Sequence, residues 1–211
     1  PHLNAGSHQV GAFYEGSGTL FDASTTGSLL TTVAGGLGGD NPVMTIVGGA
    51  VDPSGNLYVV DSRSAVVRKV DLATGLSRVV AGTGYEGRNP DGVDASLLNL
   101  AAPSSITFNS AGDLFVSDID AYKIYRIDHA THAVVTYAGN GGNPIGRGDG
   151  GPATAASIGT PIAMATSRSG DLYFSDAQSS SIRVIDHATG LIRTIAGNQP
   201  RSSDGDGGPA S

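Results

Sequence analysis

The stretch Gly170-Asp-Leu-Tyr-Phe-Ser-Asp176, followed by Ser181-Ile-Arg-Val-Ile-Asp186 and Leu191-Ile-Arg-Thr-Ile-Ala-Gly197, decides the fold of this chain. With Pro161-Ile-Ala-Met-Ala-Thr166, which comes before it, the stretch contains four short apolar runs. Gly, Asp, Ser or Thr stands at the ends of most runs, a pattern typical of short strands joined by tight turns. We therefore predict a four-stranded antiparallel unit over residues 161–197.

This unit is repeated along the chain. The second run recurs as Asn56-Leu-Tyr-Val-Val-Asp61 and as Asp113-Leu-Phe-Val-Ser-Asp118. The alanine near the end of the fourth run recurs at 34, 81, 138 and 196, so that successive copies lie 47, 57 and 58 residues apart. A repeat of this length with four antiparallel strands indicates the blades of a β-propeller. The predicted fold class is therefore all-β.

The order of these motifs resembles the NHL repeat. The resemblance is to the long bacterial version, whose linker between blades carries Gly-Asp-Gly-Gly-Pro-Ala, as at Gly148–Ala153 and Gly205–Ala210. It covers about residues 42–211 well and about 10–40 weakly. It implies a propeller of four-stranded blades that binds proteins or other polymers through its loops, by analogy with the family.

We expect a single propeller domain over residues 1–211, with about four blades. The expected blades are residues 1–35, 36–82, 83–139 and 140–197, and residues 198–211 form a linker toward a further blade. Residues 1–10 are either the innermost strand of the first blade or an extended arm. The resemblance implies about six blades, so three interpretations remain open. The chain is part of a larger propeller, a small four-bladed ring, or an arc completed by another subunit.

The composition limits the class of partner. The chain has 12 basic and 19 acidic residues, a net charge of −7. Nucleic acids and anionic membrane surfaces are bound by clustered Lys and Arg, so neither is an expected partner. Cysteine is absent, which leaves no disulfide and no thiolate metal site. No apolar run approaches the roughly 18 residues of a membrane span. No signal peptide is visible, and Pro1 is either a processed end or an arbitrary cut.

Two sets of aspartates recur in the repeat. One set ends the second strand of each blade, and the other begins the turn after the third strand: Asp61, Asp118 and Asp176; Asp71, Asp128 and Asp186. They could form rings of carboxylates, but Asp commonly caps the backbone of a following turn, so we expect structural turns. His132 stands where this turn has Gly in the other copies. Because His tolerates the left-handed region, we expect the turn to be retained.

The linkers repeat an Arg followed by Asp-Gly: Arg88 with Asp91, Arg147 with Asp149, Arg201 with Asp204. We expect turns held by Arg–Asp contacts, and one helical turn at 152–157 with Pro152 in its first turn. Asp204 and Asp206 are weak calcium candidates, since they lack the third acid and the distal Glu of an EF-hand loop. The expected cofactor is otherwise none. The histidines are expected on the surface, because a metal site needs three or four convergent ligands.

The inner strand of each blade decides the enzyme question, because it lines the central channel. The channel positions are Gly49, Val51, Ser105, Thr107, Ala163 and Ala165. None is a histidine or carboxylate that could act as a general base or metal ligand. Catalysis is therefore not expected from these strands, although missing blades could supply such groups.

The favoured hypothesis is a non-catalytic binding or scaffold module, extracellular or on a cell surface, that recognises a protein or polysaccharide through its linkers. The candidate contacts are residues that break the repeat: Tyr85, Glu86, Arg88, Asn89 and Arg147. One alternative is a propeller enzyme, a metal-dependent lyase or a hydrolase, whose active-site blades are missing here. The other is a structural protomer that associates with copies of itself by strand addition.

Overall fold

The computed structural model describes residues 45–87, 89, 91–142 and 148–197, which all belong to the unit formed by residues 32–211. The predicted first blade, the arm at 1–10 and the linker at 198–211 lie outside the described residues. Within the described part, the chain forms three four-stranded antiparallel sheets and two single-turn 3₁₀ helices. The all-β propeller-type fold predicted from the repeat is confirmed. No described helix has the length and apolar character needed to cross a bilayer.

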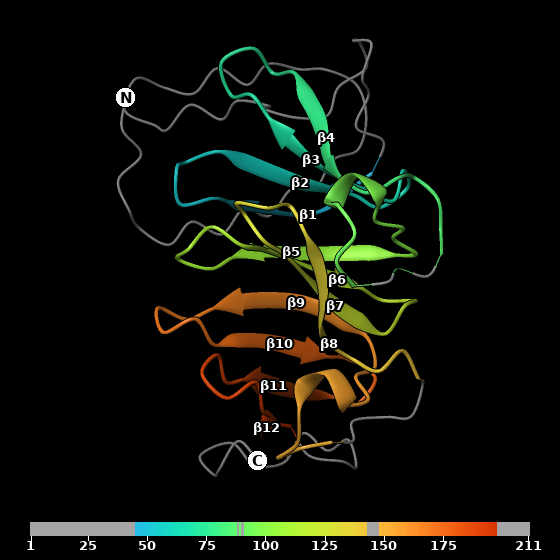
Figure 1. Cartoon of the computed structure of the whole chain (residues 1–211), viewed down its shortest axis with the longest axis vertical. Coiled ribbons are helices and arrows are strands. Elements are labelled where there is room, and N and C mark those ends of the chain that lie inside the picture. Colours follow the sequence, from blue (N-terminus) through green and yellow to red (C-terminus); the bar gives the residue numbers. More distant parts are fainter. Residues whose placement is uncertain (1–44, 88, 90, 143–147, 198–211) are drawn as a thin grey trace, which may run out of the picture. The chain divides into compact units, whose positions relative to one another are not determined.

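Each sheet is one blade, and its strands follow one another in chain order (Figure 1). The second blade contains β1 (Ile46–Val51), β2 (Leu57–Asp61), β3 (Val66–Val70) and β4 (Ser77–Ala81). The third contains β5 (Pro103–Phe108), β6 (Leu114–Asp118), β7 (Lys123–Ile127) and β8 (Val134–Ala138). The fourth contains β9 (Pro161–Thr166), β10 (Leu172–Asp176), β11 (Ser181–Ile185) and β12 (Ile192–Ala196).

The three inner strands lie side by side, with β5 in contact with both β1 and β9. Ser104 of β5 donates its hydroxyl to the carbonyl oxygens of Pro161 and Ile162 in β9, both at 3.2 Å. On the other side, a Cβ on Gly48 of β1 would lie only 2.7 Å from the carbonyl oxygen of Ser104. A side chain at this position would push the two strands apart, so glycine permits the close approach.

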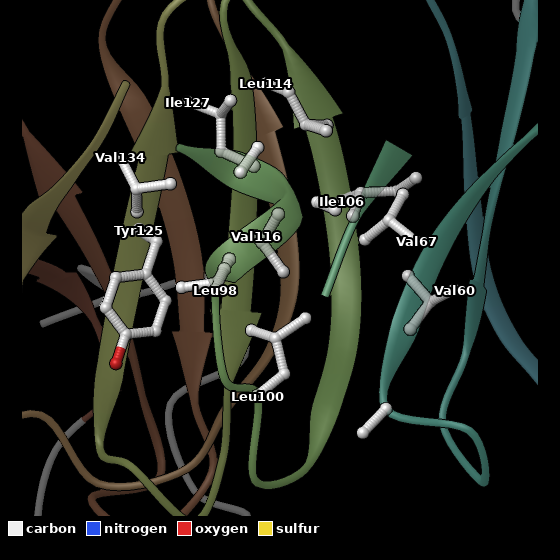
Figure 2. Close-up of a cluster of buried hydrophobic side chains, with 13 residues drawn as sticks. Val60, Val67, Leu98, Leu100, Ile106, Leu114, Val116, Tyr125, Ile127 and Val134 are labelled. Atoms are coloured by element: carbon white, nitrogen blue, oxygen red, sulfur yellow. The ribbon is translucent and has the colours of Figure 1, made fainter. Parts of the chain in front are cut away.

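Linker residues fill the space between neighbouring blades. Leu98 and Leu100, both fully buried, precede β5 and pack in one apolar cluster with residues of the second and third blades. Figure 2 shows these two leucines with Val60 and Val67 on one side and Val116 close by. Full burial of a leucine contributes about 2 kcal/mol, so the linker supplies much of the core of this joint.

The next joint is built in the same way. Ala156 and Ile158 of the following linker are buried and pack with Ile124 of β7 in a second apolar cluster. Val67, Ile124 and Ile182 occupy equivalent positions in the three blades. Val67 and Ile124 are 0% exposed, but Ile182 is 38% exposed. Described linkers pack in the same clusters as Val67 of the second blade and Ile124 of the third, whereas the linker after the fourth blade, at 198–211, lies outside the described residues.

Each linker also joins two blades through its 3₁₀ turn. In η1 (Ala95–Leu97), the carbonyl of Ala95 accepts the N–H of Gly82, which follows β4. The N–H of Ala95 donates to the carbonyl of His132 in the next blade. In η2 (Ala153–Ala155), Ala153 makes the equivalent bonds. The helical turn expected at 152–157 is therefore present, with Pro152 as its N-cap and not inside its first turn. The turn η1 has no proline and was not predicted.

The turn after the third strand keeps its geometry with a histidine in place of glycine. His132 has a φ of +59°, close to the +69° of Gly190 in the next blade. The N–H of each residue donates to the carbonyl of the Asp four residues earlier, at 2.9 and 2.8 Å. The predicted retention of this turn is confirmed.

Candidate functional site

The inner strands contain few side chains that could take part in catalysis or metal binding. Ala163 and Ala165 of β9 are exposed, whereas Ser105 and Thr107 of β5 are half-buried between neighbouring strands. Among the residues that the structure describes, no three His, Asp or Glu side chains come together in a way that could hold a metal ion. The strands β1, β5 and β9 contain no ionisable side chain. These positions therefore offer neither a general base nor a metal ligand.

The aspartates that end the second strand are buried and hold two segments of backbone together. Asp61, Asp118 and Asp176 are each 0% exposed. Each accepts N–H groups from the residues just before the inner strand and from the turn that follows the aspartate. The donors are Thr45 and Ser64 for Asp61; Ala101, Ala102 and Ala121 for Asp118; and Gly159 and Ser179 for Asp176. These carboxylates fix the start of the inner strand in every described blade.

The partner of this carboxylate differs among the blades. Arg68 Nε lies 3.3 Å from Asp61, and Arg183 Nη1 lies 3.9 Å from Asp176. In the third blade, Tyr125 occupies the equivalent place in the strand. Burial raises the pKa of Asp118, although the N–H groups of Ala102, Ala101 and Ala121 act in the opposite direction. The third blade therefore contains a buried carboxylate that is stabilised mainly by backbone donors.

The aspartates after the third strand close their own turns. Asp71 accepts the N–H groups of Ala73 and Thr74, and Asp128 accepts those of Ala130 and Thr131. Asp186 accepts the N–H and the hydroxyl of Thr189, each at 2.8 Å. These hydrogen bonds lower the pKa of all three carboxyl groups.

The linker aspartates hold the linker to the outer strand of the following blade. Asp91 accepts the N–H of Thr136 in β8, and Asp149 accepts the N–H of Thr194 in β12, both at 2.8 Å. Asp149 also accepts from Arg183 Nη2 at 2.7 Å. Arg183 is a buried residue of β11, and the expected contact of Asp149 with Arg147 is not tested by the described residues. Arg88 and Arg147 lie outside the described residues.

The acid stability of the fold should depend on Asp149. Burial raises the pKa of Asp149, but hydrogen bonds from Thr194 and Arg183 outweigh it and hold the pKa below its ordinary value. Such a group contributes stability above its unfolded pKa, roughly 3.9, and loses it as the pH falls through the folded pKa. We expect the free energy of unfolding to fall more steeply below about pH 4 in the parent than in Asp149→Asn. Urea unfolding between about pH 2 and 6 measures this, and equal slopes would contradict it.

The candidate contact residues do not share one environment. Tyr85 is 77% exposed and Glu86 is exposed. Asn89 is half-buried, and its amide bonds to the backbone of Asn99. The calcium candidates Asp204 and Asp206 lie outside the described residues. The sequence did not single out Asn99, because its role depends on a contact with a residue ten positions away.

One hollow, with a volume of about 760 Å³, lies beside the β3–β4 turn of the second blade, at Lys69, Asp71, Leu76 and Arg78. Another, of about 210 Å³, lies beside Asp176 and Ile182 of the fourth blade. Tyr85 lines neither of them. Neither hollow therefore belongs to the candidate contact segment.

The chain is similar to proteins of several kinds. It is 33% identical over 155 residues to the protein Suppressor of quenching 1, chloroplastic, from Arabidopsis thaliana, covering 68% of this chain and 14% of that protein. A chain of a nidogen–laminin complex has a TM-score of 0.54 and 16% identity, covering 75% of this chain and 50% of that chain. An inactive virginiamycin B lyase from Staphylococcus aureus, with quinupristin, has a TM-score of 0.50 and 18% identity, covering 79% of this chain and 45% of that chain.

These relatives share the fold and differ in what they do. A binding complex and a lyase both resemble this chain, so the fold alone does not decide between binding and catalysis. This chain spans at most half of the length of each of these relatives. The model of the teneurin NHL domain matches residues 90–206, which is more than half of the chain. The repeat, the three described blades and this match agree, and the chain belongs to the NHL family of β-propellers that this model describes.

Proposed function

We propose that this chain is a non-catalytic binding module that recognises a protein or another polymer through the linker between its second and third blades. The observation that carries the proposal is the exposure of Tyr85, at 77%, within a segment whose backbone is held in place. Exposed aromatic side chains on rigid loops frequently provide the central contacts of protein interfaces.

Hydrogen bonds to Thr83 support this presentation of Tyr85. The Thr83 hydroxyl donates to Asn99 Oδ1 at 2.6 Å and accepts the N–H of Tyr85 at 3.1 Å. The N–H of Thr83 donates to the carbonyl of Leu98, a buried residue of the blade joint. A loop that is ordered before binding loses less conformational entropy when the partner arrives.

The composition of the inner strands favours binding over catalysis in this part of the molecule. Their channel positions carry Gly, Val and Ala, which have no reactive side-chain group, and Ser and Thr. The hydroxyl groups of Ser and Thr are weak nucleophiles at neutral pH without an activating base. The alternative is an enzyme whose ligands come from other blades. Metal analysis of the purified protein distinguishes the two, because stoichiometric zinc or calcium would favour the enzyme.

Association with copies of the chain is the second alternative. A concentration-dependent mass in sedimentation experiments would support it, and a stable monomer would count against it. An extracellular or surface location belongs to the same proposal, although the relative from Arabidopsis thaliana is a chloroplastic protein.

A peptide selection tests the proposed contact. We would select binders from a phage-displayed random peptide library on the parent protein, then measure their affinity for Tyr85→Ala. We expect affinity to fall by about tenfold or more, as for a central aromatic contact. The control is Leu76→Ala, a 69% exposed apolar residue of the second blade, which should leave affinity unchanged. Equal affinities for parent and Tyr85→Ala would exclude this segment as the contact surface.

A further inference from the structure

Two asparagines form a clamp at the base of the Tyr85 segment. The side-chain oxygen of Asn89 accepts the N–H of Asn99 at 2.7 Å, and its Nδ2 donates to the carbonyl oxygen of Asn99 at 2.6 Å. The same Nδ2 lies 3.3 Å from the hydroxyl of Tyr125 in β7. This reciprocal pair of bonds ties Asn89, which follows the Tyr85 segment, to the backbone of Asn99.

The side chain of Asn99 contacts the Tyr85 segment directly. It accepts the Thr83 hydroxyl at 2.6 Å, and its amide lies against Gly87, where an added Cβ would be only 2.8 Å from Asn99 Nδ2. The backbone of Asn99 is fixed, because Leu98 and Leu100 on either side are fully buried in the joint between two blades. The core therefore anchors Asn99, and Asn99 in turn contacts both sides of Tyr85 along the chain.

We infer that Asn99 is a positioning residue for recognition by Tyr85, and that Asn89 serves the clamp and does not contact the ligand. The inference rests on the proposed function of the Tyr85 segment. Asn99 joins the blade joint to Thr83 and Gly87, so it transmits the rigidity of the core to the exposed tyrosine. Loss of its side chain should release this segment while the blades remain packed.

The equivalent linker residue before the fourth blade suggests a substitution that removes the support of the Tyr85 segment and keeps the blade joint packed. Ser157 lies between the buried Ala156 and Ile158, as Asn99 lies between its leucines. The Ser157 hydroxyl is 3.2 Å from Nδ2 of Asn140, which corresponds to Thr83. The same fold thus accommodates serine at this position, and Asn99→Ser should preserve the joint. Serine is too short to support Gly87 as asparagine does.

The first measurement is hydrogen exchange of the Tyr85 amide by NMR, without any ligand. We expect exchange to be about tenfold faster or more in Asn99→Ser, because local opening of the segment becomes easier. The melting temperature should stay within about 4 °C of the parent, a change of roughly 1 kcal/mol or less. Unchanged exchange would overturn the inference, whatever the peptides do.

The second measurement uses the library-selected peptides that depend on Tyr85. Their affinity for Asn99→Ser should fall by about tenfold, mainly through slower association, because a disordered segment must be ordered during binding. Asn89→Ala should lower the peptide affinity by a similar factor, because the Asn89 side chain forms the clamp with Asn99. Faster exchange with unchanged affinity would overturn the positioning role. If no selected peptide depends on Tyr85, the proposed function fails, and the exchange experiment still decides whether Asn99 orders the segment.

Discussion

Replacement of Gly139 by alanine is expected to lower the free energy of unfolding by more than about 4 kcal/mol. Gly139 follows β8 with a φ of +91°, and an added Cβ would collide with the carbonyl oxygen of Tyr122. It would also approach the side chain of Ile158 to 3.0 Å. The N–H of Gly139 is held by the carbonyl of Ala153 at 3.0 Å, so the backbone has little room to move away.

The magnitude follows from the nature of the collision. A left-handed conformation alone costs a non-glycine residue about 1–2 kcal/mol. Here the obstacle is backbone, which cannot change rotamer, and the loss should exceed about 4 kcal/mol. Urea unfolding followed by circular dichroism measures the free energy of unfolding.

Gly190 provides the matched control for this substitution. Its φ is +69°, but nothing lies within 4 Å of the place where a Cβ would be. His132 occupies the equivalent position of the third blade in the parent protein. Gly190→Ala should therefore lose only about 1 kcal/mol. Similar losses for the two variants would show that the close approach at Gly139 is not the cause.

Replacement of Arg183 by methionine is expected to cost about 3–5 kcal/mol, the range for breaking a buried ion pair by removal of one partner. Arg183 is 0% exposed and donates to the carbonyl of Ser157 at 3.0 Å and to Asp149 at 2.7 Å. Asp176, 3.9 Å away, is also fully buried. The substitution removes the cation while burial of the Asp176 carboxylate continues. Chemical unfolding measures the loss.

A double variant tests this explanation. Asp176→Asn in the Arg183→Met background removes the uncompensated charge, so the double variant should be more stable than Arg183→Met alone. Arg126 is the control, because it is 33% exposed and lies 4.0 Å from Asp113. Arg126→Met should change stability by less than about 1 kcal/mol. A loss at Arg126 as large as that at Arg183 would contradict the role of burial.

Much of the fold could be predicted from the residues alone, because the blade is a local structure. Its strands are short apolar runs, and its turns are closed by hydrogen bonds over a few residues, as at Asp71. The four-stranded unit predicted over residues 161–197 is present as β9, β10, β11 and β12, which span residues 161–196. The candidate site was predictable only in part. Tyr85 was recognisable because it interrupts the repeat, whereas the role of Asn99 was not.

The strand order, the repeat and the side chains available to the inner strands follow from the residues alone, since each depends on residue type and spacing within one blade. The partners of the buried charges depend instead on how the linkers and blades pack together. Asp149 pairs with Arg183, 34 residues later, because the linker returns along the outer strand of the next blade. Tertiary packing likewise places the contacts that hold the backbone of the exposed Tyr85. The Tyr85 segment depends on Asn99, and Asn99 depends on apolar burial between two blades that are not adjacent until the chain has folded.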